Sequence, residues 1–226
     1  VRALTSDQLS KLSSDQVALM ATDDIAALST GQISHLATAA IAALTTDQAK
    51  ALTTAAINAL SSAQITAIET ADLAAMSSAQ LGKMGNTQVA QLTSVQVAAL
   101  TTGQIKSLST GQVSALTSAQ LNALTSTQLP SLSSTQVRAL TTEQLSKLTT
   151  TQVAGLSTAQ VAALSTGQVA ALTSVQLNAM ASDDLKALTT TQVRALTSDQ
   201  LSKLSSDQVA LMETADVAAL STAQIS

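Results

Sequence analysis

The chain is built from one eight-residue unit that recurs without a gap from Ala3 to Ser226, which makes twenty-eight octads. This repeat limits the fold more than any other feature, because units so short can bury apolar side chains only by stacking on neighbouring units. The consensus is A-L-[ST]-[ST]-x-Q-[VLI]-x, and we number its residues as positions 1 to 8. Position 2 is Leu in 22 octads, and the exceptions are Ile68 and all five Met residues of the chain.

Three architectures compete for this pattern. A β-solenoid would alternate apolar and polar residues between frequent turn residues, whereas here the two aliphatic positions lie five apart and Gly is sparse. In one continuous helix, eight residues exceed two turns by about 80°, so the Leu stripe would spiral around the helix. The pattern favours a third architecture, an all-α solenoid with one very short capped helix per octad, and the β-solenoid remains the alternative.

The third architecture is favoured because positions 2, 3, 6 and 7 match a helix start. Leu, Ser/Thr, Gln and an aliphatic residue occupy the N′, N-cap, N3 and N4 places of a capping box with a hydrophobic staple. In the first octad Thr5 would cap the helix, Gln8 would reach back to the Thr5 N–H, and Leu4 would pack on Leu9.

Substitutions at positions 3 and 6 occur in the same octads, as expected of hydrogen-bonding partners. Asp replaces Gln at position 6 in four octads, and each of these octads has Ala or Glu at position 3. The four pairs are Ala21 with Asp24, Glu69 with Asp72, Ala181 with Asp184, and Glu213 with Asp216. There the caps are expected one residue later, at Thr22, Thr70, Ser182 and Thr214. Two octads keep half of the motif, with Gly85 before Gln88 and Thr53 before Ala56.

The charged residues also fit short helices that run from position 4 to position 1 of the next octad. All fourteen acids lie at positions 3, 5 or 6, and all ten bases lie at positions 8 or 1. Acids then fall in the first turn of each helix and bases in the last, as the helix dipole favours. The pattern also predicts acid–base pairs four residues apart on these helices. The pairs are Asp7–Lys11, Glu143–Lys147 and Asp199–Lys203.

We therefore expect residues 1–226 to form a single repeat array, with Leu and Val/Ile inside and position 5 outside. A longer period is also present, because residues 1–34 resemble residues 193–226 and differ only at 21, 23, 25 and 31. The offset of 192 residues is twenty-four octads. This duplication, and a first residue that is not Met, predict a fragment of a longer protein with a 192-residue super-repeat.

No catalytic residue, cofactor site or metal site is predicted. His35 is the single histidine, so a Ser–His–Asp arrangement is not feasible, and we expect it at a helix end on the surface. The acid pairs Asp23–Asp24 and Asp183–Asp184 lack the dense oxygen ligands and Gly turn of a calcium loop. The Met residues replace core Leu and are interpreted as gap-fillers. Local irregularity is expected at Pro130 and at residues 83–86.

Composition argues against several partners. The net charge is −4 and there are no aromatic residues, so neither a basic stripe nor base stacking is available for nucleic acid. No apolar run approaches a transmembrane span, so no membrane insertion is expected. Self-association and a surface polymer remain open as partners.

The octads ALSTGQVA and ALTTTQVR resemble the Leu/Thr/Gln/Ala octapeptide tracts of very large bacterial secreted or surface proteins of adhesin-like type. The resemblance covers the whole chain and implies a stalk or spacer on the cell exterior, with any binding head elsewhere in the parent protein. A non-enzymatic structural role is therefore the main hypothesis. The alternative is a binding module that uses the solenoid surface for glycan, protein or ice.

Overall fold

The computed structural model describes residues 3–225, and the regular elements in that range are helices, with no strand among them. The chain divides into two compact units, Val1–Leu116 and Thr117–Ser226. In the described part of the first unit the helices are α1 (Ser6–Ser10), α2 (Ser14–Ala18), α3 (Thr22–Ala26), α4 (Thr30–Ser34), α5 (Thr38–Ala42), α6 (Thr46–Ala51), α7 (Thr54–Ala59), α8 (Ser62–Ala67), α9 (Thr70–Ala75), α10 (Ser78–Gly82), α11 (Asn86–Gln91), α12 (Ser94–Ala99), α13 (Thr102–Ser107) and α14 (Thr110–Ala115).

The second unit continues the same octads. Its elements are α15 (Ser118–Ala123), the 3₁₀-helix η1 (Leu129–Ser131), α16 (Ser134–Arg138), α17 (Thr142–Lys147), α18 (Thr150–Ala154), α19 (Thr158–Ala162), α20 (Thr166–Ala171), α21 (Ser174–Asn178), α22 (Ser182–Lys186), α23 (Thr190–Val193), α24 (Ser198–Ser202), α25 (Ser206–Ala210), α26 (Thr214–Ala218) and α27 (Thr222–Ile225). The prediction of one short helix per octad is confirmed, and the β-solenoid alternative is wrong.

Each α-helix begins at position 4 and ends at position 7, 8 or 1, so it has only four to six residues. The residues between helices are extended. Around α8, for example, Ser61 has φ −70° and ψ 162°, and Ile68 has φ −63° and ψ 129°. These extended residues change the chain direction at every octad, so that successive helices wind around an axis and do not join into one long helix.

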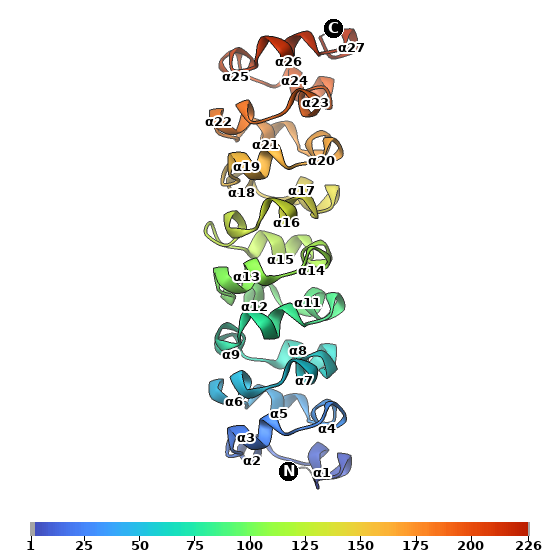
Figure 1. The fold of residues 1–226 in the computed structure, drawn as a ribbon, viewed down its shortest axis with the longest axis vertical. Helices are drawn as coiled ribbons and strands as arrows, with labels where there is room; N and C mark the ends of the chain where they lie inside the picture. Colours follow the sequence, from blue (N-terminus) through green and yellow to red (C-terminus); the bar gives the residue numbers. More distant parts are fainter. Residues whose placement is uncertain (1–2, 226) are drawn as a thin grey trace. The chain divides into compact units, whose positions relative to one another are not determined.

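Within each unit, a helix packs on the helix three octads away. In the first unit α6 packs on both α3 and α9, and Figure 1 shows these three helices one above another. Hydrogen bonds between successive turns join residues 25 to 31 apart in the sequence. One turn of the solenoid therefore takes between three and four octads.

Positions 2 and 7 form the core of the solenoid. In the first unit every position 7 from Leu9 to Val113 is at most 1% exposed, and position 2 is buried from Leu28 onward. Position 5 points outward, as Val95 at 70% exposure and Val175 at 67% show. The predicted division between inside and outside is confirmed.

Pro130 disturbs its octad as predicted. No α-helix forms there, and the chain instead makes the 3₁₀-helix η1. The cap of that octad survives, because Gln128 N–H donates to Thr125 Oγ1 at 3.2 Å and Thr125 N–H donates to Gln128 Oε1 at 2.8 Å. Residues 83–86, by contrast, were predicted to be irregular and are not, because Gly85 adopts the usual N-cap conformation before α11.

The predicted cap shift in the Asp-containing octads is wrong. Thr22, Thr70, Ser182 and Thr214 are the first helical residues, and the N-caps before them make no side-chain hydrogen bond. In these octads the backbone N–H of the position 6 Asp donates to the N-cap carbonyl, at 2.9–3.1 Å. Because packing against neighbouring turns fixes where each helix starts, the chain loses the side-chain cap and keeps the register.

The predicted acid–base pairs four residues apart do not form either. Among the described residues the ion pairs within 4.0 Å are Lys50–Asp47 and Lys186–Asp183, both three residues apart. In α1 and α24 the predicted base is the C-cap residue, beyond the last helical turn. All four paired side chains are more than half exposed, so these pairs contribute little to stability.

We expect far-ultraviolet circular dichroism of the purified chain to show a helical spectrum of reduced amplitude. The reduction follows because helices of four to six residues have few complete internal hydrogen bonds. A β-type spectrum, or the full amplitude of long helices, would contradict this fold.

Candidate functional site

The most regular polar feature of both units is the Gln side chain at position 6. Its Oε1 atom accepts the backbone N–H of the N-cap residue, as from Thr101 to Gln104 at 2.7 Å. In return the Gln104 N–H donates to Thr101 Oγ1 at 3.2 Å. This reciprocal capping box is the one predicted from the sequence, and it recurs in most octads of the described chain.

The same Gln side chains also bind the preceding turn of the solenoid, a contact that was not predicted from the sequence. Gln104 Nε2 donates to the carbonyl oxygens of Leu73 at 2.7 Å and Met76 at 2.8 Å, 31 and 28 residues earlier. Gln176 does the same in the second unit, to Leu145 at 3.0 Å and Leu148 at 2.7 Å. The accepting carbonyls lie at the C-terminal end of a helix four octads earlier and in the segment after it. We call this repeated arrangement the glutamine ladder.

The glutamine ladder is buried. Gln104 is 2% exposed and Gln176 is 3% exposed. A buried amide needs partners for both its oxygen and its nitrogen, and here the oxygen binds its own helix while the nitrogen binds the turn before. Each Gln therefore connects the start of one helix to the end of another.

The sequence does contain a signal for the ladder, although the capping-box motif by itself does not distinguish it. A capping box accepts Glu as readily as Gln, and the helix dipole favours an acid in the first turn. Yet position 6 is Gln in 22 octads and never Glu. A carboxylate could accept the N-cap N–H but has no hydrogen to donate to the earlier carbonyls, which explains the exclusive use of the amide.

Aspartate at position 6 replaces the amide at buried points of the ladder. Asp72 is 2% exposed and Asp184 is 6% exposed. Burial raises the pKa of Asp72, against the lowering effect of a hydrogen bond from Thr46, and the Glu69 charge raises it further. Burial raises the pKa of Asp184 as well, with a contribution from Asp183.

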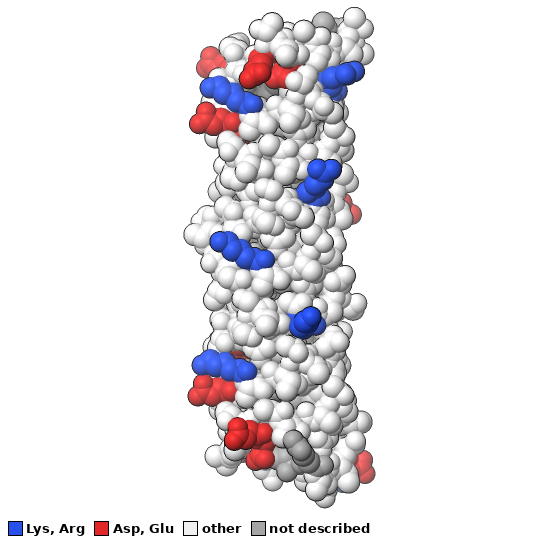
Figure 2. Space-filling view, viewed as in Figure 1, with Lys and Arg blue, Asp and Glu red and all other residues white. Residues whose placement is uncertain are grey.

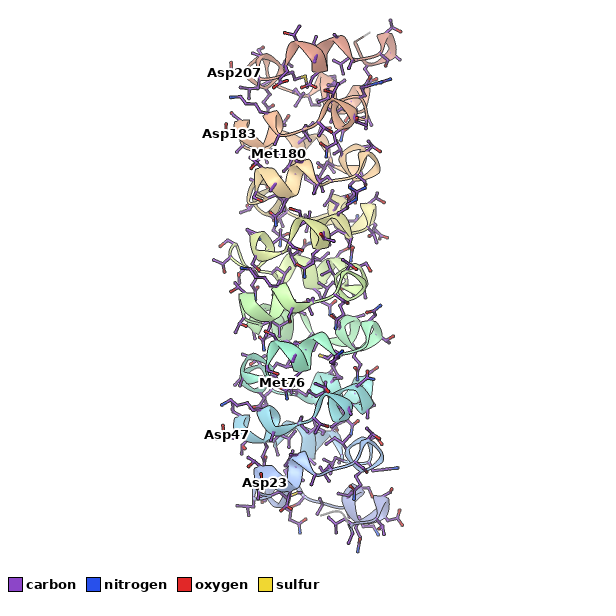
Figure 3. The ribbon with its side chains drawn as sticks, in the orientation of Figure 1. Asp23, Asp47, Met76, Met180, Asp183 and Asp207 are labelled. Atoms are coloured by element: carbon purple, nitrogen blue, oxygen red, sulfur yellow. The ribbon has the colours of Figure 1, made fainter. Side chains whose placement is uncertain are left out.

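The candidate metal ligands and catalytic groups of the sequence do not come together in one site within the described chain. His35 is exposed at the C-cap of α4. Asp23 and Asp183 are exposed first-turn acids, and among residues 3–225 no group of three or more His, Asp or Glu side chains could hold a metal ion. Met76 and Met180 lie among the stacked helices at 3% and 5% exposure, as expected of residues that replace core Leu (Figure 3).

The charged side chains are sparse on the surface. On the face drawn in Figure 2, Lys and Arg side chains are separated by uncharged surface and do not form a continuous stripe. Over the described residues, no helix has both the length and the apolarity to cross a membrane.

Comparison with known families assigns the repeat. A family model described as ALTTAQ repeat matches residues 17–54, 65–102, 96–126, 119–150, 126–158, 145–174 and 177–212. These segments cover most of the chain. No curated protein matches it.

We expect Gln104→Glu to lower the free energy of unfolding by about 2–4 kcal/mol at neutral pH, measured by urea denaturation. The introduced carboxyl would keep the Thr101 N–H bond but lose both donations to the earlier turn and place a charge in the core. The matched control is Gln8→Glu, because Gln8 makes the same cap bond but is exposed. Equal effects at the two sites would contradict the ladder.

We also expect Gly85→Ser to stabilise the chain by about 0.5–1 kcal/mol. A Cβ atom built on Gly85 would have its nearest neighbours at 3.7 and 3.8 Å, which is ordinary contact. The serine hydroxyl would then complete the half capping box that Gln88 already provides. Gly85→Ala is the control, since it restricts the unfolded chain equally without a hydroxyl. A serine variant no more stable than the alanine variant would contradict the expected cap.

Proposed function

We propose, from the premise that the chain belongs to the ALTTAQ repeat family, that it is a non-enzymatic structural tract serving as a stalk or spacer in its parent protein. The observation that carries this proposal is that each octad is stabilised by the turns next to it in the solenoid. Such an array can be lengthened by adding octads without a change in the local structure.

A duplicated sequence within the chain supports this. Val1–Met20 and Val193–Met212 are identical in sequence but have different neighbours. Val17 is fully buried because a later turn covers it, as is Leu9. Val209, which corresponds to Val17 in the second copy, is 45% exposed. Gln8 is exposed, whereas the corresponding Gln200 is 2% exposed and donates to Leu172 O at 2.6 Å in the turn before it. Burial therefore comes from the adjacent turns, as an extendable scaffold requires.

The hydrogen bonds of the two commonest polar side chains, at positions 6 and 3, also support the spacer role. In most octads the Gln amide and the position 3 hydroxyl bind the backbone of the solenoid itself, as Gln64 and Ser61 do. These groups act as scaffold. The outward position 5 varies among octads and holds Ala, Asp, Thr, Gly, Val or Glu, as expected where a substitution leaves the scaffold unchanged.

A location outside the cell or on its surface belongs to the proposal and rests on the resemblance to surface and secreted octapeptide tracts. An antibody raised against the tract should label intact cells that produce the parent protein. Labelling only after the cells are lysed would contradict this location.

The spacer role is tested by deletions in register. Removing one octad, such as residues 99–106, or two octads should shorten the particle by equal steps and leave the remaining helices intact. Small-angle scattering measures the step, and circular dichroism measures the helices. Removing four residues, 99–102, is the control, because it places Ser and Thr where neighbouring turns require aliphatic side chains, and it should lower stability far more.

The alternative function, a binding module on the solenoid surface, predicts a different outcome. A one-octad deletion would then abolish binding of the parent protein to a specific glycan or protein while the fold stays intact. If the tract is a spacer, the parent protein with one octad deleted should still bind its target and should only be shorter.

A further inference from the structure

Asp72 occupies a place in the glutamine ladder that an ionised carboxylate fits poorly. Its Oδ1 accepts a hydrogen bond of 2.9 Å from Thr46 Oγ1, on the helix three octads earlier. Its Oδ2 is buried and has no hydrogen-bond partner among the described residues. A buried carboxylate oxygen without a donor is costly, and protonation removes that cost.

The charges around Asp72 do not offset its burial. On its own helix the nearest charge is Glu69, at the N-cap, which has the same sign. On α6, which packs against α9, Asp47 and Lys50 pair with each other at 3.1 Å and are more than half exposed. Two further helices contact α9. α12 carries no charged residue. α13, whose Gln104 binds the Leu73 carbonyl of α9, carries Lys106, which is exposed and is not among the groups that shift the Asp72 pKa.

We propose that protonation of Asp72 controls the packing of α9 on α6. A neutral Asp72 carboxyl stabilises this contact, which we call the joint, and an ionised carboxylate weakens it. The geometry that supports this is the buried Oδ2, the Thr46 bond across the two turns, and the absence of an amide donor at this place of the ladder. The joint is a property of the solenoid and does not depend on the spacer role.

The direction of the pH effect follows from the raised pKa of Asp72. Because the folded chain holds this proton more tightly than the unfolded chain, the stabilising contribution is complete below the ordinary Asp pKa of 3.8. It is lost as the pH rises through the folded-state pKa. Asp184 is the corresponding residue in the second unit, where burial raises the pKa in the same direction.

Hydrogen exchange of the full chain tests the joint. After correction for intrinsic exchange chemistry, opening of residues 46–51 and 70–75 should increase between pH 4 and pH 7.5, relative to residues 110–115 around Gln112, which binds Leu81 and Met84 and not α9. The expected increase is about tenfold for each unit by which folding raises the pKa of Asp72. Asp72→Asn should abolish it, whereas Asp47→Asn, which removes an exposed charge from α6, should leave it unchanged.

Two further measurements keep the test decisive. If Asp72→Asn does not fold, Asp72→Ala replaces it, because Ala40 and Ala56 show that the fold accepts alanine at position 6. Carbon-13 titration of the Asp72 carboxyl should give a midpoint above 3.8. A midpoint at or below that value, or the same local pH dependence with and without Asp72, would overturn the proposal.

Discussion

The side-chain amide at position 6 supplies hydrogen bonds that helices this short cannot make for themselves. In any α-helix the first four N–H groups and the last four C=O groups lack partners within the helix. A helix of five residues consists almost entirely of such groups. In this solenoid one Gln oxygen accepts from the start of its own helix, and the nitrogen of the same Gln donates at the end of a helix in the turn before, as Gln64 does with Ser61 and Leu36.

Coupling of these two functions in one side chain has a structural consequence. A helix start is completed only by its own octad, but the helix end is completed only by the following turn. The end of α20 illustrates the dependence, since Val169 O and Leu172 O accept from Gln200 Nε2 of the following turn, at 2.9 and 2.6 Å. Local and long-range order therefore form together, and an isolated octad has neither.

The sequence predicted the local structure well and the contacts between turns poorly. The capping box, the helix starts and the buried positions 2 and 7 follow from residue types at fixed spacing, and the structure confirms them. Many helices end at position 8 or 7, before the predicted position 1. The cap shift at Thr22 and Thr70 was wrong because it treated each octad as an isolated helix, whereas packing fixes the start. The glutamine ladder was missed for a related reason. The number of octads per turn depends on the extended residues between helices, so the partners 28 and 31 residues away could not be located from the repeat alone.

Neighbouring turns constrain each other through side-chain size as well as through hydrogen bonds. The glycines show the sequence separation of the residues that meet. A Cβ atom on Gly82 would lie 3.3 Å from Ser107 O, and one on Gly111 would lie 3.0 Å from Asn86 Nδ2. On Gly155 it would lie 3.7 Å from Pro130 Cγ. In all three cases the partner is 25 residues away, the spacing at which Ser hydroxyls such as that of Ser14 bind the next turn. The approaches at Gly82 and Gly111 are closer than ordinary contact, whereas the one at Gly155 is not. A larger side chain at Gly82 or Gly111 would therefore press on the turn beside it, so that octads which vary along the chain are constrained in pairs across the turns.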